Sequence, residues 1–160
     1  MAVQRRRLDK LSKKELIRLV HQIQCRENPR SPSRDELRVP LGIFVPALGP
    51  LEAICKHLKE SKHFSYHEIA VLLGRDDRTI WGTYRRARRK VAGKLLITRS
   101  RFSFPAGILR RRRLSPWENI VSYVKEGYAL RYHEIAALLH RDARTVWTLY
   151  ARAQKKRGKE

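Results

Sequence analysis

YHEIAVLLGRDDRTIWGTYRRARRK (residues 66–90) returns 66 residues later as YHEIAALLHRDARTVWTLYARAQKK (residues 132–156), with 16 of 25 positions identical and no gaps. The likeness extends upstream of both segments: VPLGIF at 39–44 precedes the first, and its counterpart FPAGIL at 104–109 precedes the second. Apolar residues in each copy recur at helical spacing, interrupted by turn residues. The duplication therefore predicts two similar units of about 50 residues, each with three helices.

Residues with known positional preferences place the helix ends. Pro50 and Pro116 suit the first turn of a helix, where the missing N–H is harmless, and Asp76 and Asp142 can cap a following helix with a carboxylate oxygen. The expected second helices are 66–73 and 132–139, and the expected third helices, after a GRD or HRD turn, are 77–91 and 143–156. We therefore expect an all-α fold with two tandem three-helix units. The Pro-containing apolar strips 39–44 and 104–109 are expected to lie across the helices.

An N-terminal segment precedes the repeats. A Ser-x-x-Glu capping box at residues 12–15 predicts an amphipathic helix over Lys13–Arg26. Its apolar stripe either packs within the chain or pairs with another copy or a partner protein, so a homodimer through this helix remains open. The expected organisation is 1–38 (basic arm, amphipathic helix and linker), 39–91 (first unit), 92–103 (linker), 104–156 (second unit) and 157–160 (basic tail).

The repeated segment has the pattern of a helix-turn-helix. Ala70 and Ala136 are small residues where two helices must cross closely. On the first copy's third helix, Ile80, Tyr84, Ala87 and Val91 recur at spacings typical of a buried stripe. The opposite face is expected to point toward bases in a DNA groove. Its members are Arg78, Trp81, Gly82 and Arg85, with Arg144, Trp147 and Thr148 in the second copy. The two tryptophans could equally lie at the boundary of the core.

Further basic residues are expected to contact phosphates, which strengthens binding without reading sequence. They are Arg75, Arg86, Arg88, Arg89, Lys90, Arg110, Arg111, Arg112, Arg113, Arg141, Arg152, Lys155 and Lys156. The run Arg110–Arg113 has no counterpart in the first copy and is either a phosphate clamp or a solvated cluster. Arg5, Arg6 and Arg7 could form a minor-groove arm, or simply a basic tail.

The pattern Tyr66-x-Glu68-Ile69-Ala70-x-x-Leu73-Gly74, followed by a polar turn, Thr79-Ile80 and a basic end, resembles the DNA-binding region four of bacterial sigma factors. The second copy matches through Tyr132, Glu134, Ile135, Ala136 and Leu139, with His140 where the family usually has Gly. The Trp residues and Arg-Asp turns are similar to tandem helix-turn-helix proteins of archaeal genomes. The resemblance covers about two thirds of the chain and implies a trihelical DNA-binding fold, without the segment that melts promoters.

Composition points to a polyanionic partner. The chain has 160 residues with 37 Lys and Arg against 15 Asp and Glu, a net charge of +22. No apolar run approaches the roughly 20 residues that a membrane-spanning helix needs. The basic N-terminus lacks an apolar signal core, which predicts a cytoplasmic, nucleoid-associated protein. Cys25 and Cys55 have no CxxC spacing, so reduced thiols are expected and neither a disulfide nor a zinc site is.

Catalytic motifs are not visible in the sequence. His67-Glu68 and His133-Glu134 begin like a zinc-protease motif, but Val71 and Ala137 stand where its second His would be. Both glutamates are instead expected near the positive end of a helix dipole. We expect no enzyme activity, metal or cofactor. The predicted function is sequence-biased binding of double-stranded DNA, as in a transcriptional regulator; the alternatives are an architectural chromatin protein and a structural RNA- or ribosome-associated protein.

Overall fold

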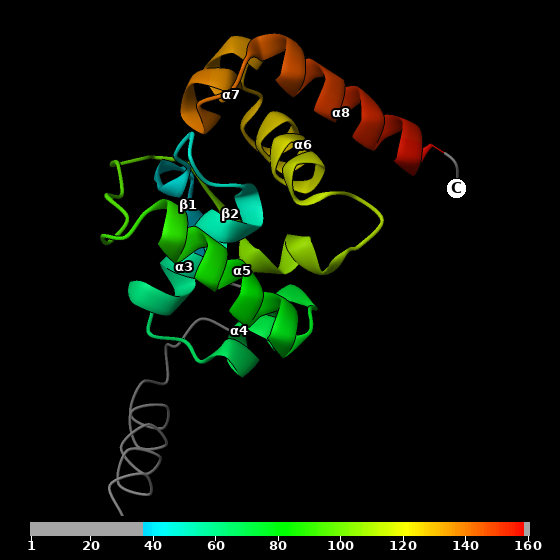
Figure 1. The fold of residues 1–160 in the computed structure, drawn as a ribbon. Coiled ribbons are helices and arrows are strands. Elements are labelled where there is room, and N and C mark those ends of the chain that lie inside the picture. The colour runs from blue at the N-terminus through cyan, green and yellow to red at the C-terminus, as the bar shows by residue number, and fades with distance from the viewer. Residues whose placement is uncertain (1–36, 159–160) are drawn as a thin grey trace, which may run out of the picture. The chain divides into compact units, whose positions relative to one another are not determined.

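The computed structural model describes residues 37–158 and shows a mainly helical protein with one small two-stranded sheet (Figure 1). The expectations for Arg5–Arg7, the Lys13–Arg26 helix and Cys25 lie outside the described residues. The helices are α3 (Pro50–Glu60), α4 (Tyr66–Leu73), α5 (Asp77–Lys90), α6 (Pro116–Tyr128), α7 (Tyr132–Leu139) and α8 (Ala143–Arg157). These bounds agree with the predicted ones to within a residue wherever the sequence set both ends.

The predicted caps are confirmed. Oδ1 of Asp76 accepts the N–H of Arg78 at 2.8 Å, and Asp142 does the same for Arg144. The carboxylate of Glu68 accepts the N–H of Ser65 at 2.8 Å, which places a negative charge at the start of α4. These bonds satisfy amide groups that a helix leaves unpaired in its first turn.

In both copies, the residue that ends the second helix has a left-handed backbone conformation. Gly74 ends α4 with φ 60°, and His140 ends α7 with φ 50°. In each case this residue and the next donate backbone hydrogen bonds to carbonyls in the last turn of the helix. The departure from Gly at His140 therefore leaves the turn geometry unchanged, at the energetic cost that a side chain bears in the left-handed region.

The fold is mainly α-helical, but the two Pro-containing strips, which we expected only to lie across the helices, also pair with each other as a small sheet. β1 (Arg38–Pro40) pairs antiparallel with β2 (Ser103–Pro105), and each strand runs into a short 3₁₀ helix, η1 (Leu41–Ile43) or η2 (Ala106–Arg110). β1 begins one residue before the predicted first unit, and β2 begins inside the predicted 92–103 linker. We call 38–43 and 103–110 the two arms.

The arms are related by an approximate two-fold axis. Val39 pairs with Phe104, its own counterpart in the other copy. The N–H of Leu41 donates to the carbonyl of Phe102 at 3.0 Å, and the equivalent N–H of Ala106 donates to the carbonyl of Leu37 at 2.8 Å. Each bond is the image of the other when the copies are interchanged. Such self-complementary pairing is the signature of a two-fold interface.

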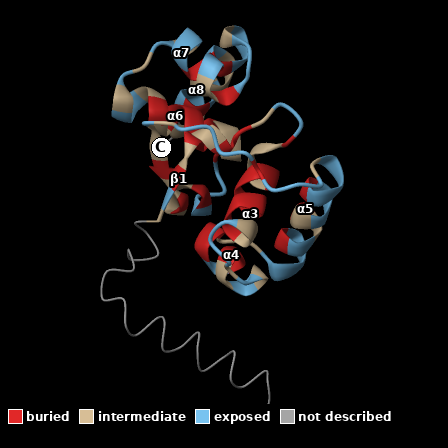
Figure 2. Ribbon diagram, turned by 90° about the vertical axis from the view of Figure 1, so that its left-hand side faces the viewer, coloured by how far each residue is buried: buried red, intermediate tan, exposed pale blue. Residues whose placement is uncertain are grey.

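Each arm packs against the other copy's helices as well as its own. η2 contacts α4 of the first copy, and η1 contacts α7 of the second. One hydrophobic core runs through both copies and includes Phe44, Ile69, Phe104 and Ile135, all almost fully buried. Residues 37–158 accordingly belong to one compact unit, in which the copies share an interior. Figure 2 shows the buried residues of this core in red, along the helices and near the sheet.

The connection between the copies is attached to the first arm. The N–H of Thr98 donates to the carbonyl of Gly42 at 3.1 Å. A Cβ at Gly42 would stand 1.9 Å from the carbonyl oxygen of Thr98, so this close approach requires glycine. No strand forms between residues 92 and 102.

The predicted buried stripe of the third helix is correct at Ile80 and Ala87. Tyr84 and Val91 are only half-buried, since the hydroxyl of Tyr84 reaches Glu60 at 3.2 Å. Thr83, which the pattern placed outside the stripe, is buried.

Cys55 has a free, buried thiol whose pKa is raised to about 12 by burial, as expected of an unreactive cysteine.

His57 makes stability depend on pH. Its ring is buried with neither nitrogen hydrogen-bonded, and burial, with a smaller contribution from Lys62, lowers its pKa to about 4. The unfolded chain binds this proton more readily, so the free energy of unfolding should fall as pH drops from 6.5 toward 4, by at most about 1.4 kcal/mol per pH unit. Denaturant unfolding of wild type and His57→Phe between pH 7.5 and 5 measures the difference.

Above pH 5, the effect of His57 on the free energy of unfolding can be measured without a contribution from the carboxylates. Glu52 and Glu118 have lowered pKa values, so their stabilisation is lost only below the ordinary range of a glutamate. His133→Gln, at an exposed position, serves as the control and should keep the wild-type slope. Equal slopes for wild type and His57→Phe would contradict the assignment.

Candidate nucleic-acid interface

The outer face of α5 carries the predicted base-facing residues of the first copy. Arg78 and Arg85 are exposed, and Trp81 exposes 45% of its surface. The guanidinium of Arg85 lies over the Trp81 ring, 4.7 Å from its centre. A Cβ at Gly82 would meet no atom within 4 Å, so the surface beside Trp81 is open. The stack holds a flat aromatic and a cation together on the surface of the helix.

The outer face of α8 repeats this arrangement with different side chains. Arg144 is exposed, and Trp147 exposes 56% of its surface. Thr148 is half-buried, and its hydroxyl donates to the carbonyl of Arg144 at 2.9 Å. Ala151 replaces Arg85, so Trp147 has no equivalent arginine stacked on it. About half of each tryptophan is covered and about half faces solvent, so placement at the core boundary and contact with DNA both stay open as interpretations.

The remaining elements present both helices outward. α3 packs against α5, and α6 packs against α8. In the first copy α3 lies between the sheet and α5 (Figure 2), and in the second copy α6 lies between the sheet and α8 (Figure 1). The third helices therefore occupy equivalent outer positions, each with its Asp-capped N-terminus at the surface.

Three of the predicted phosphate contacts form ion pairs within the chain: Arg86, whose Nε lies 3.8 Å from the carboxylate of Glu52, and two lysines. Nζ of Lys90 lies 2.8 Å from the carboxylate of Glu52, and Nζ of Lys156 lies 2.7 Å from that of Glu118, the equivalent pair. Burial acts to raise the pKa of Glu52, but hydrogen bonds from Lys90 and from the N–H of Gly49 outweigh it and lower that pKa. The pair joins the end of the third helix to the start of the first.

The arginine run takes part in the contact between copies. The guanidinium of Arg112 donates to the carbonyl of Gly74 at 2.8 Å, across 38 positions of sequence. Arg110 lies against Gly74, and the carbonyl of Arg111 accepts from Nδ2 of Asn119 at 3.3 Å. The side chains of the run are exposed. Arg112 thus supports the turn before α5, a role that neither the clamp nor the solvated-cluster interpretation included.

The other predicted phosphate contacts divide by their surroundings. Arg75 is half-buried, and its Nε has no hydrogen-bond partner. Arg141 lies over the ring of Trp117, 5.1 Å from its centre. Arg86 also bonds to the hydroxyl of Thr83 at 3.1 Å. Arg88, Arg89, Arg152 and Lys155 are exposed.

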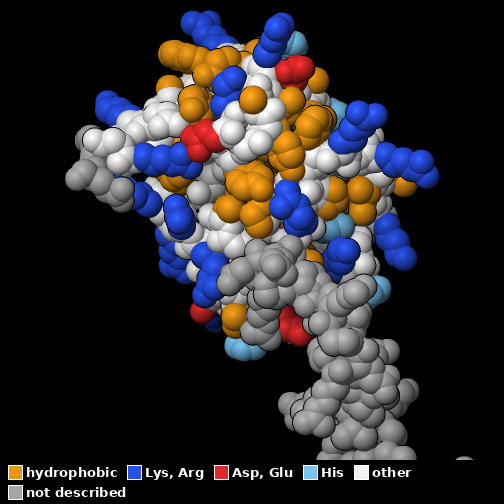
Figure 3. Space-filling view, turned by 180° about the vertical axis from the view of Figure 1, so that it is seen from behind, with side chains coloured by type: hydrophobic (Ala, Val, Ile, Leu, Met, Phe, Trp, Pro, Cys, Tyr) orange, Lys and Arg blue, Asp and Glu red, His pale blue; other side chains and the backbone are white. Residues whose placement is uncertain are grey.

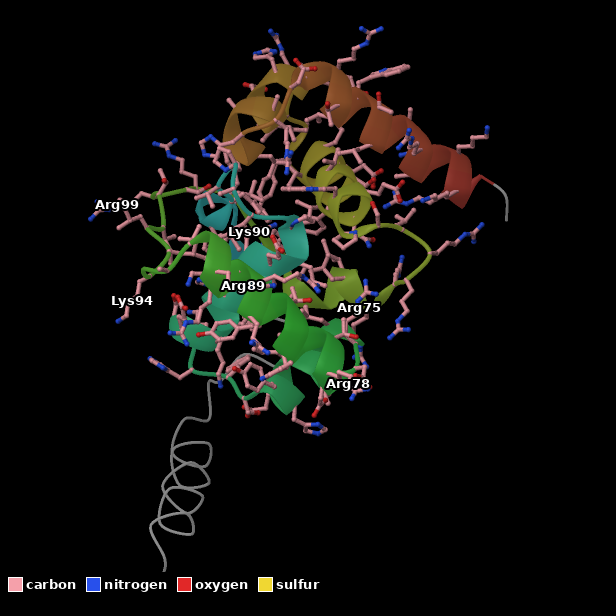
Figure 4. The ribbon with its side chains drawn as sticks, viewed as in Figure 1. Arg75, Arg78, Arg89, Lys90, Lys94 and Arg99 are labelled. Atoms are coloured by element: carbon pink, nitrogen blue, oxygen red, sulfur yellow. The ribbon has the colours of Figure 1, made fainter. Side chains whose placement is uncertain are left out.

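The connection between the copies carries basic residues that were not among the predicted phosphate contacts. Lys94, Arg99 and Arg101 are exposed. In Figure 4, Lys94 and Arg99 extend from this connection, Arg89 and Lys90 stand near the C-terminal end of α5, and Arg75 and Arg78 stand near its N-terminal end. The available signal was the presence of three basic residues in the short stretch KLLITRSR, residues 94–101.

Cations are not confined to one side of the molecule. Figure 3 shows the opposite view to Figure 1, where Lys and Arg side chains surround a group of hydrophobic ones and acidic side chains are few. The distribution of charge alone therefore does not show which face would bind a polyanion. The exposed side chains of α5 and α8 are the more informative feature.

None of the helices within 37–158 has the length and apolar character to cross a membrane.

The chain matches no protein-family model, and it has no match among curated proteins or solved structures.

Proposed function

We propose that this chain binds double-stranded DNA through α5 and α8, which act as the recognition helices of two helix-turn-helix units. The observation that carries the proposal is the duplicated outer helix: each has an Asp cap, an exposed arginine in its first turn and an exposed tryptophan one turn later. The resemblance of the repeated segment to sigma region four supports the same function.

The chemistry of these faces suits a DNA groove. The major groove of B-DNA is wide enough for an α-helix, and arginine recognises the edge of guanine through two parallel hydrogen bonds. An exposed indole ring offers apolar contact to a thymine methyl group. Gly82 would let the backbone of α5 approach the bases closely, because nothing fills the space beside it. We infer a sequence preference from these directional groups, as in a transcriptional regulator.

The net charge of +22 supports binding to phosphates around this centre. Exposed cations at the end of α5 and on the connection would follow the DNA backbone, as would Arg152 and Lys155 on α8. Such contacts release counterions, so affinity should fall steeply as salt rises.

Non-specific coating of DNA is a second candidate. It is favoured by the spread of Lys and Arg over the face seen in Figure 3. Selection of bound fragments from a random duplex pool separates the two functions. A regulator should enrich a motif and bind it about 10³-fold more tightly than random duplex, whereas a coating protein should enrich none. Stronger binding to folded RNA than to duplex DNA at matched salt would overturn both.

Single substitutions test the role of the outer helices. Arg78→Ala or Arg144→Ala should each reduce the preference for the selected site over random duplex by about 1–3 kcal/mol, because a base contact is lost. Gel shifts on the two duplexes at one salt concentration give this ratio. Lys62→Ala removes an equal charge from an exposed loop outside α5 and α8.

The control variant Lys62→Ala should weaken binding to both duplexes alike, so that the ratio of the two affinities stays at the wild-type value. If Arg78→Ala and Lys62→Ala lower affinity without changing the ratio, the arginine does not read bases. The same measurement on Arg110→Gln and Arg111→Gln should show uniform weakening and a shallower salt dependence. Arg112 is excluded from this test because it bonds to Gly74.

A further inference from the structure

We propose that the DNA site of this chain is an inverted repeat, which one chain occupies with its two-fold axis on the dyad of the duplex. This inference rests on the proposed function. A tandem duplication alone would suggest two half-sites in the same orientation, because the copies follow one another along the chain. The contacts between the copies argue for the opposite orientation.

The arms of the two copies make symmetric contacts. β1 and β2 pair antiparallel at equivalent residues, and the bonds Leu41–Phe102 and Ala106–Leu37 interchange when the copies are swapped. η2 lies on α4 as η1 lies on α7. Interchanging the copies therefore reproduces the contacts, which requires a rotation close to 180° between them. Copies related by translation would make different contacts on their two sides.

The same rotation also relates the outer helices α5 and α8. α3 carries α5 as α6 carries α8, and the ion pairs Glu52–Lys90 and Glu118–Lys156 fix each third helix to its first helix in the same way. The two third helices thus inherit the symmetry of the arms. Duplex DNA has two-fold axes perpendicular to its length, and a two-fold protein matches it with half-sites in inverted orientation.

Contacts between the copies hold them in a fixed relative orientation. The guanidinium of Arg38 bonds to Oγ of Ser103 at 2.8 Å and to the hydroxyl of Tyr128 at 2.9 Å, which ties the first arm to the second copy. Arg112 bonds in the other direction, to Gly74. With a shared core between them, the copies cannot reorient independently as domains on a flexible linker do. The orientation and spacing of the half-sites should therefore be fixed.

The inverted repeat should be imperfect in the natural protein. The exposed faces differ at Asp77 and Ala143, at Gly82 and Thr148, and at Arg85 and Ala151. A triple variant, Asp77→Ala with Gly82→Thr and Arg85→Ala, gives α5 the α8 residues at these positions. It removes one charge of each sign, so the net charge is unchanged, and the added threonine enters open space.

The experiment is selection from a random duplex pool with the full chain and with the triple variant, followed by gel shifts on designed duplexes. The wild type should enrich two related half-motifs in inverted orientation at one fixed spacing, with one chain bound per duplex. The triple variant should enrich a more nearly perfect palindrome. For both proteins, the inverted duplex should bind at least about tenfold more tightly than one in which a half-motif is reversed.

The outcomes separate this inference from the function beneath it. Half-motifs in the same orientation, a single half-motif, or equal affinity for the inverted and reversed duplexes would overturn the inverted repeat while leaving DNA binding in place. Enrichment of no duplex at all would overturn sequence-specific binding, and the inverted repeat with it. A triple variant that selects the unchanged wild-type site would also count against the assignment, because α5 would then not be reading its half.

Discussion

Phe104→Ala should lower the free energy of unfolding by about 3–5 kcal/mol, the range for deleting a fully buried phenylalanine. Phe104 lies at the centre of the strand pair with none of its surface exposed. Its ring stacks on that of Phe44, 6.1 Å between centres, and Phe44 in turn contacts Trp117 of the second copy. The side chain thus fills the core at the boundary between the copies, where neighbouring groups from both would lose contacts.

Chemical denaturation, followed by tryptophan fluorescence and circular dichroism, measures this loss. Unfolding should remain a single transition by both probes, because the copies share one core. Phe64→Ala deletes the same ring from a half-buried loop position and should reduce stability much less. Two separate transitions in Phe104→Ala, with only one of them shifted, would show that the copies fold independently and would contradict the shared interior.

Lys56→Ala should reduce stability by about 3 kcal/mol, because it leaves a largely buried carboxylate without its cation. The side chain of Lys56 is completely buried, and its Nζ donates to Oε1 of Glu60 at 2.7 Å. Glu60 exposes 17% of its side chain and would keep only the hydroxyl of Tyr84. We expect the low end of the range for a broken buried pair, since water can reach part of Glu60. Urea titration at pH 7 measures the change.

The second copy provides a matched control. Ser122 occupies the position equivalent to Lys56, and its buried hydroxyl has no hydrogen-bond partner. Ser122→Ala should therefore be neutral or slightly stabilising. The double variant Lys56→Met with Glu60→Gln removes both charges and should recover most of the loss. A loss in Lys56→Ala no larger than that in Ser122→Ala would mean that the pair contributes nothing to stability.

The helices were predictable because their ends depend on neighbouring residues. Pro50, Pro116, Asp76 and Asp142 act within one turn of the helix that each begins. The apolar spacing of Ile69, Leu73 and Ile80 required no knowledge of the partner surface. The sequence thus predicted the order of the six described α-helices and both bounds of four of them, α4, α5, α7 and α8, to within a residue.

The arms were not predictable because their partners lie about 65 residues away in sequence. Strands of three residues that contain proline lack the alternation from which a strand is recognised. A proline suits such a strand only at a sheet edge, and a two-stranded sheet consists of edges alone. The burial of two polar residues was not predicted for a similar reason. Lys56 and Thr83 are acceptable in the core only because they bond to Glu60 and Arg86.

The candidate interface was predicted in part. The exposed face of each third helix followed from the spacing of its buried face, so the exposure of Arg78, Trp81 and Arg144 was predicted correctly. The engagement of Lys90 and Lys156 with Glu52 and Glu118 was missed, because the partners are 38 residues apart and only the fold brings them together. Net charge could not identify these two lysines, since an internal ion pair and a phosphate contact draw on the same residue type.

The reciprocal arms also bear on how the protein comes into being. During translation, all three helices of the first copy are made before η2 exists, so the surface of α4 that η2 covers has no partner until residues 106–110 have been made. The nascent first half cannot complete its interior, and the final assembly of both halves waits for the second. A ribosome that stalls before this point would hold a chain with uncovered apolar surface, the kind of species that chaperones bind.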